Sequence, residues 1–224
     1  MYRKIIDCVC KANFGEYYQT KSSQTANTDT DLALQSHHAV GYCKMVRAWY
    51  MDDSNADQRE THMLDPPVFV SLDELFEKCG VEYMKFNADT WETNVEFAEL
   101  RKKRGYTYED LCEISRETLP DYDNKLKNFY TEHIHSDEEI RFVLEGCGYF
   151  DVRDSDDRWI RVEVSKDDLI IVPAGIYHRF SLNTDNYIKV KRLFVGEPVW
   201  TPINRPGADD HPVRQEYLKR MQSC

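Results

Sequence analysis

The 224-residue sequence lacks any apolar run of the roughly 18 to 20 residues that a membrane-spanning helix needs. Its opening segment, MYRKIIDCVCKANF, also lacks the uninterrupted apolar core of a secretory signal, because Asp7 divides it. These absences predict a cytoplasmic protein that does not insert into a membrane.

Paired cysteine motifs are absent as well. The seven cysteines are odd in number and scattered, and no two of them form a CxxC pair. This distribution fits reduced thiols better than a disulfide framework or a thiolate zinc site. Any metal is therefore expected to bind through nitrogen and oxygen donors.

An excess of positive charge is also missing, since 29 Lys and Arg residues face 40 Asp and Glu residues, for a net charge of −11. Polyanions attract clustered Lys and Arg, so this balance argues against nucleic acid or an anionic membrane as a partner. The 41% of hydrophobic and 31% of charged residues are typical of a folded globular chain, whose length suits one main domain. We expect a monomer whose partner is a small molecule.

The chain is expected to have three parts. Residues 15–44 are polar, rich in Ser, Thr and Asn, and without a sustained hydrophobic period. We therefore expect residues 1–44 to be a disordered N-terminal extension. Residues 45–206 form the expected domain, and residues 207–224 form a polar C-terminal tail.

Helices are predicted in the first half of that domain. The segment SLDELFEKCG carries Ser71 and Glu74 at capping-box spacing and ends at Gly80. The segment TNVEFAELRKKRG repeats this arrangement, with Thr93 as the expected N-cap. Two further helices are expected on either side of Pro120, in the segments YTYEDLCEISRETL and DYDNKLKNFYTE.

After residue 132 the pattern changes to the alternation that is typical of strands. Short candidates separated by turns such as EGCG, DSDD and NTDN are HIH, IRFVLE, YFDVR, WIRVEV, DLIIVPAG, HRFSL and IKVKRLFV. Many short strands at close spacing predict a mainly β protein, an antiparallel barrel or sandwich with the short helices packed outside.

A candidate metal site lies at the start of these strands. Alternate side chains of a strand share a face, so His133 and His135 can reach one ion. If the alternation continues through the hairpin, Glu139 and Arg141 lie on the same face. Asp137 has the same parity, so this geometry alone does not decide which acid would be a ligand.

The segment VPAGIYHRF supplies a third imidazole, because its Pro and Gly turn delivers His178 to the start of another strand. Three histidines and one carboxylate suit a divalent ion of intermediate hardness. An octahedral ion held in this way would keep two positions for substrate or dioxygen.

These residues carry a resemblance. HIHSDEEIRFVLEG is similar to the first cupin motif in its HxHxxxExxxxxxG core, and PAGIYH is similar to PxGxxH of the second. The segments VRAWYMDD, EIRFVLEGCGYFDVRD, PAGIYHRF and KRLFVGEPVWTPINRP resemble the acireductone dioxygenase family more closely, over about residues 45–206. The general cupin pattern has glycines six residues before the first His and before the Pro, where this chain has Lys127 and Asp167.

The resemblance implies a cupin-type antiparallel β-barrel, or jelly roll, that binds one Fe²⁺ or Ni²⁺ ion. The implied ligands are His133, His135, Glu139 and His178. Arg141 would then balance the negative charge of the substrate, the alternative being a structural ion pair with a hairpin acid. Asp137 and Glu138 would be solvated.

The implied reaction is the cleavage by O₂ of acireductone, 1,2-dihydroxy-3-keto-5-methylthiopentene, in the methionine salvage pathway. With Fe²⁺ the products would be 4-methylthio-2-oxobutanoate and formate, and with Ni²⁺ they would be 3-methylthiopropanoate, formate and CO. The resemblance also implies the nucleus as a second location. The alternative function is a differently specific or inactive cupin that acts as a small-molecule-binding or regulatory protein.

Overall fold

The computed structural model describes residues 46–198 and 201–223 of the chain, and all of them belong to one compact unit. The extension expected over residues 1–44 lies outside the described residues. No helix within the described ranges is both long and apolar enough to cross a membrane.

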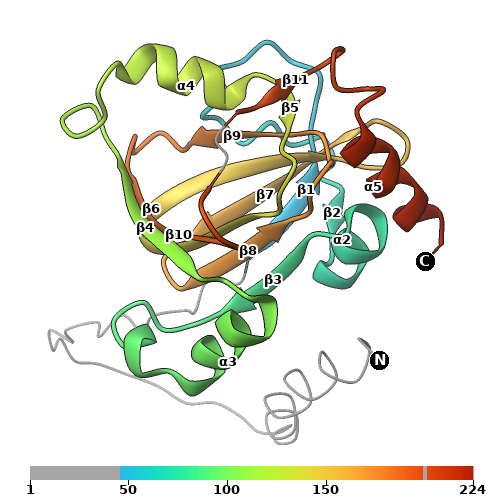
Figure 1. The fold of residues 1–224 in the computed structure, drawn as a ribbon. Coiled ribbons are helices and arrows are strands. Elements are labelled where there is room, and N and C mark those ends of the chain that lie inside the picture. The colour runs from blue at the N-terminus through green and yellow to red at the C-terminus, as the bar shows by residue number, and fades with distance from the viewer. Residues whose placement is uncertain (1–45, 199–200, 224) are drawn as a thin grey trace, which may run out of the picture. The chain divides into compact units, whose positions relative to one another are not determined.

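The described strands form two antiparallel sheets that share one long strand, β6 (Glu139–Arg153) (Figure 1). The order of the first sheet is β11 (Ile203–Asn204), β5 (His133–Ile134), β9 (His178–Leu182), β6, β7 (Trp159–Ser165), β1 (Arg47–Tyr50) and β2 (Phe69–Val70). The order of the second sheet is β4 (Tyr108–Ile114), β10 (Ile188–Phe194), β6, β8 (Asp168–Val172) and β3 (Glu82–Lys85). This arrangement confirms the prediction of a mainly β, antiparallel fold, although the pairing among the described strands does not close into a full ring.

Strand β6 corrects one detail of the sequence prediction. The segments IRFVLE and YFDVR were expected as two strands divided by an EGCG turn, but the chain continues through as a single strand. The register with β10 shifts at this point, which marks a β-bulge. Gly146 has a positive φ of 79° and lies so close to β10 that a Cβ atom would collide with the Tyr187 carbonyl. Gly146 therefore allows β6 to approach β10 closely next to this bulge, and it does not form a hairpin turn.

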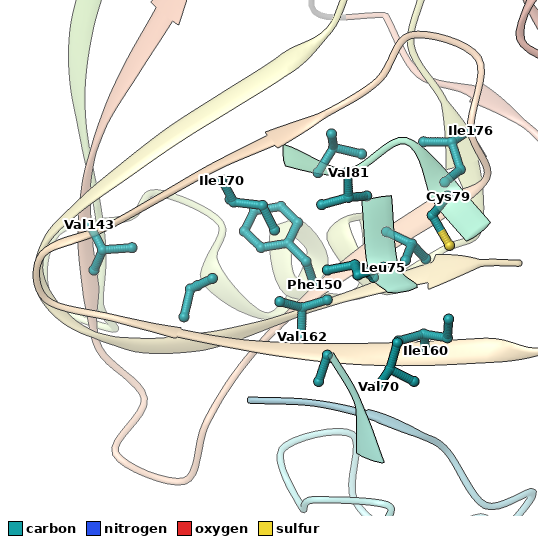
Figure 2. Close-up of a cluster of buried hydrophobic side chains, with 14 of the residues drawn as sticks. Val70, Leu75, Cys79, Val81, Val143, Phe150, Ile160, Val162, Ile170 and Ile176 are labelled. Atoms are coloured by element: carbon teal, nitrogen blue, oxygen red, sulfur yellow. The ribbon is translucent and has the colours of Figure 1, made fainter. Parts of the chain in front are cut away.

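The main core lies where the two sheets and one helix, α2 (Leu72–Cys79), face one another. Figure 2 shows side chains from β2, α2, β6, β7 and β8 pointing into it. The labelled members are Val70, Leu75, Cys79, Val81, Val143, Phe150, Ile160, Val162, Ile170 and Ile176. A second cluster centred on Phe142 joins α3 (Val95–Arg104) to the other side of the second sheet. These two clusters hold the strands that carry the candidate site.

The predicted helix starts are confirmed in one case and corrected in the other. Helix α2 has the expected capping box, in which Ser71 and Glu74 satisfy each other's backbone N–H groups, and it ends at Gly80 with a φ of 69°. Helix α3 is capped by Asn94, whose Oδ1 accepts from the Phe97 backbone N–H at 2.8 Å. Thr93 was wrongly predicted as the cap, because its hydroxyl instead bonds the Thr90 carbonyl within the short 3₁₀ helix η1 (Trp91–Thr93).

The segment YTYEDLCEISRETL, expected as a helix, contains strand β4 instead. All seven residues of β4 pair with β10. Two ion pairs reinforce this pairing: Lys191 Nζ lies 2.8 Å from Glu109 Oε1, and Arg192 Nε lies 2.6 Å from Asp110 Oδ1. The second expected helix after Pro120 is confirmed as α4 (Tyr122–Tyr130).

The last described residues form helix α5 (Pro212–Gln222), within the segment expected as a polar tail. Helix α5 lies beside α2 (Figure 1). Tyr217 of α5 is buried in the main core, and its hydroxyl donates to the Cys79 carbonyl at 3.1 Å. Most of α5 is polar, so the sequence pattern around Tyr217 gives little indication of this contact.

Candidate metal centre

Three histidines converge at one end of the first sheet. His133 opens β5 and pairs directly with His178, which opens β9. Their ring centroids are 4.5 Å apart, and the His135 ring lies 4.8 Å from His133 and 5.3 Å from His178. One nitrogen from each ring lies within 4.8 Å of the other two. The three imidazoles could therefore share one metal ion.

Backbone carbonyls orient two of these rings. His133 Nδ1 lies 2.6 Å from the Thr131 carbonyl oxygen, and His178 Nδ1 lies 3.0 Å from the Ile176 carbonyl oxygen. A carbonyl oxygen can only accept a hydrogen bond, so each Nδ1 carries a proton, and the lone pair of the neutral ring is then on Nε2. The His178 Nε2 is buried and has no hydrogen-bond partner among the described residues. A buried nitrogen in this state has the chemistry of a metal ligand.

Glu139 and Arg141 complete the cluster from the first residues of β6. Glu139 Oε2 lies 3.3 Å from His135 Nε2, 3.7 Å from His178 Nε2 and 3.2 Å from Arg141 Nη2. Burial alone would raise the pKa of Glu139, but the charge of Arg141 and the adjacent imidazoles of His135 and His178 lower it well below its usual range. The carboxylate is therefore ionised at neutral pH.

The imidazole of His133 is neutral at neutral pH. Burial is the largest cause, and the neighbouring His178 adds repulsion, so the pKa of His133 falls to about 3. Metal ions compete with protons for an imidazole nitrogen. A histidine held in its neutral form thus needs no deprotonation before it binds a metal at neutral pH.

All five predicted site residues come together: the three histidines, Glu139 and Arg141. Of the two neighbouring acids, Asp137 is exposed as expected. Glu138 is not simply solvated, because it accepts from the Tyr106 hydroxyl at 2.7 Å and faces Arg104. Both acids therefore differ in surroundings from Glu139.

The orienting carbonyls of Thr131 and Ile176 were missed by the sequence reasoning. Each belongs to the residue two positions before a candidate ligand. A carbonyl is present at every position, so the side chains gave no signal for them. That the carbonyl two positions before each histidine orients its ring can be recognised only from the geometry of the turn.

An antiparallel fold of two sheets with three histidines and a glutamate at one end is the structure of a cupin-type metal-binding protein. The comparisons with known proteins narrow this class. The model of the ARD/ARD' family matches residues 47–202. The chain belongs to this family, the family of the acireductone dioxygenases.

Similar proteins carry the corresponding name. Acireductone dioxygenase of Ixodes scapularis is 62% identical over 80% of this chain and 97% of the relative. Acireductone dioxygenase of Drosophila melanogaster is 58% identical over 79% of this chain and 95% of the relative. A solved acireductone dioxygenase from Bacillus anthracis, with a cadmium ion in its active centre, is 28% identical with a TM-score of 0.52, and the match covers 61% of this chain and 91% of that one.

Proposed function

We propose that this chain is an acireductone dioxygenase that binds one Fe²⁺ or Ni²⁺ ion and cleaves 1,2-dihydroxy-3-keto-5-methylthiopentene with O₂. The observation that carries the proposal is the convergence of three imidazole nitrogens within 4.8 Å of one another, in a chain of this family. The proposed ligands are His133, His135, Glu139 and His178.

The described residues fit such an ion. Three imidazoles and one ionised carboxylate form a mixed nitrogen and oxygen donor set, which both Fe²⁺ and Ni²⁺ accept. The Nε2 of His178 has no hydrogen-bond partner among the described residues, and the lowered pKa of Glu139 means that its carboxylate does not have to lose a proton before it binds an ion. A bound ion would supply Lewis acidity and a fixed template for the reactants.

Arg141 is proposed to bind the negative charge of the enediolate substrate. Its guanidinium lies beside Glu139 at the edge of the cluster, 87% of its side chain is shielded from solvent, and its Nη1 donates to its neighbour's carbonyl. A guanidinium keeps its charge when buried, and its fork of donors suits an oxygen pair. Arg141 would thereby both attract the substrate and orient it toward the metal-binding side chains.

Product analysis tests this proposal. The metal-free protein is reconstituted anaerobically with either Fe²⁺ or Ni²⁺, and synthetic acireductone and O₂ are then added. We expect formate and 4-methylthio-2-oxobutanoate with iron, and CO, formate and 3-methylthiopropanoate with nickel. If neither form consumed O₂ faster than the metal-free protein, the alternative of a non-catalytic, small-molecule-binding cupin would replace the proposal.

We further propose that residues 1–44 are dispensable for the activity. The match to the family model begins at residue 47, and all the candidate metal-donor residues follow it in the chain. A chain that begins at residue 45 is expected to keep its thermal unfolding temperature and its turnover within about twofold. Deleting residues 207–224 is the contrasting variant, because it removes the buried Tyr217 and should lower the unfolding temperature. Loss of folding in the first variant would contradict the proposed boundary.

A further inference from the structure

The segment after residue 202 packs against the strands that carry the histidines. Strand β11 pairs Ile203 with Ile134 and Asn204 with His133. The next backbone N–H, that of Arg205, donates to the Glu132 carbonyl at 3.2 Å. This segment therefore extends the first sheet directly beside one candidate ligand.

The turn before His178 is held from both sides. The Gly175 backbone N–H donates to the His135 carbonyl at 3.1 Å, while the Gly175 carbonyl accepts from Arg214 Nη1 at 3.1 Å. Gly175 has a φ of 81°, and a Cβ atom there would collide with the Val213 carbonyl at the start of α5. One glycine thus connects the backbone of His135 to helix α5.

Tyr177, the residue directly before His178, is also held by this segment. Its side chain is fully buried, and its hydroxyl donates to Asp209 Oδ1 at 2.6 Å. The guanidinium carbon of Arg214 lies 4.6 Å from the centre of the Tyr177 ring, and that of Arg205 lies 4.8 Å from it. Cation–π contacts of this kind contribute about 0.5–2 kcal/mol according to their exposure to solvent.

We propose that Arg214 is a positioning residue for the metal centre. One guanidinium bonds the Gly175 carbonyl and stacks on Tyr177, so it holds the turn that leads to His178, and the Gly175 N–H of this turn bonds the His135 carbonyl. The inference rests on the proposed metal-binding function and adds to it a residue outside the part of the chain that the family model matches. Arg214 acts through the backbone of the turn and fixes the direction of the ligating rings.

The test compares Arg214→Ala with Arg220→Ala. Both arginines belong to α5 and lie near the Tyr217 ring, with guanidinium carbons 5.3 Å and 5.6 Å from its centre, but Arg220 is exposed whereas Arg214 is partly buried. The dissociation constant for Co²⁺ is measured by competition with a chromophoric chelator, together with the visible absorption spectrum of the bound Co²⁺. Removing groups that orient metal ligands typically weakens metal affinity about 10- to 100-fold.

We expect Arg214→Ala to bind Co²⁺ at least about tenfold more weakly than the wild-type protein and to show a changed Co²⁺ spectrum. Arg220→Ala should match the wild type in both measurements. A merely structural role would lower the unfolding temperature of the metal-free protein but leave the spectrum of the folded, metal-loaded protein unchanged. Wild-type affinity and spectrum in Arg214→Ala would overturn the inference.

A second variant keeps the test decisive if Arg214→Ala does not fold. In Arg214→Lys the ammonium can still donate to the Gly175 carbonyl but lacks the planar group that stacks on Tyr177. We expect this variant to fold and to bind Co²⁺ more weakly than the wild type, and wild-type affinity would count against the proposal. If the wild-type protein itself bound no Co²⁺, the proposed metal centre would fail, which is a different outcome from a failure of Arg214 alone.

Discussion

Replacing His178 with alanine is expected to reduce metal content and O₂-dependent turnover to the levels of the metal-free protein. The imidazole supplies a buried Nε2 whose lone pair faces the cluster, and no other described nitrogen or oxygen contacts that atom as a hydrogen-bond partner. Alanine removes this donor and leaves two imidazoles and one carboxylate for the ion. His133→Ala should have the same effect, since His133 faces His178 across the same strand pair.

Elemental analysis after anaerobic reconstitution measures this effect directly, and the metal-to-protein ratio is the decisive quantity. His211→Asn is the matched control, because His211 caps α5 through Nδ1 and asparagine is also a favourable N-cap. The control should keep its full metal content and turnover. A normal metal-to-protein ratio in His178→Ala would remove this residue from the ligand set.

Strand alternation in the sequence predicted which of the candidate site residues would lie close together. The spacing of His133, His135, Glu139 and Arg141 placed them on one face if the alternation continued through the hairpin, and in the fold these side chains are neighbours. The position of His178 required one more step, since a Pro and Gly turn had to return the chain to the same end of the sheet. These side chains could be recognised because strand periodicity is a local property.

Long-range pairing explains why β4 was mistaken for a helix. Its charged residues suit an exposed helix as well as a strand when they are read alone. In the fold, Glu109 and Asp110 face Lys191 and Arg192, which lie 82 positions later in the chain. These partners favour the strand conformation of β4. A sequence window of about fifteen residues around β4 contains neither Lys191 nor Arg192, so local propensity could not indicate the strand.

Asp167 shows how the fold accommodates a departure from the cupin pattern. Where that pattern has a glycine, Asp167 adopts a φ of 81°, in the left-handed region that aspartate tolerates better than most residues. Its Oδ1 accepts from the Ala88 backbone N–H at 2.8 Å, and its carbonyl oxygen accepts from the Phe86 backbone N–H at 2.9 Å. The turn into β8 is therefore kept without glycine, which the sequence alone did not reveal.

Arg141→Ala is expected to keep the bound metal but to lower kcat/KM about 10- to 150-fold, mainly through KM. A hydrogen bond to a charged group contributes about 1.5–3 kcal/mol, which corresponds to this range. The charge of Arg141 lowers the pKa of Glu139, so that pKa should rise in the variant. The histidine donors remain in place, and we therefore expect the metal-to-protein ratio to stay near one at neutral pH.

Three variants separate the substrate role of Arg141 from a structural one. Arg141→Lys keeps the positive charge beside Glu139 but loses the planar fork, so it should recover part of the lost kcat/KM. Arg116→Ala is the control for the loss of an arginine, because its side chain is 66% exposed and paired with Asp123 on the surface. Its kinetics should equal those of the wild type. Full turnover by Arg141→Ala at low acireductone concentration would show that the guanidinium pairs with Glu139 without binding substrate, and metal loss in that variant would assign it to supporting the carboxylate ligand.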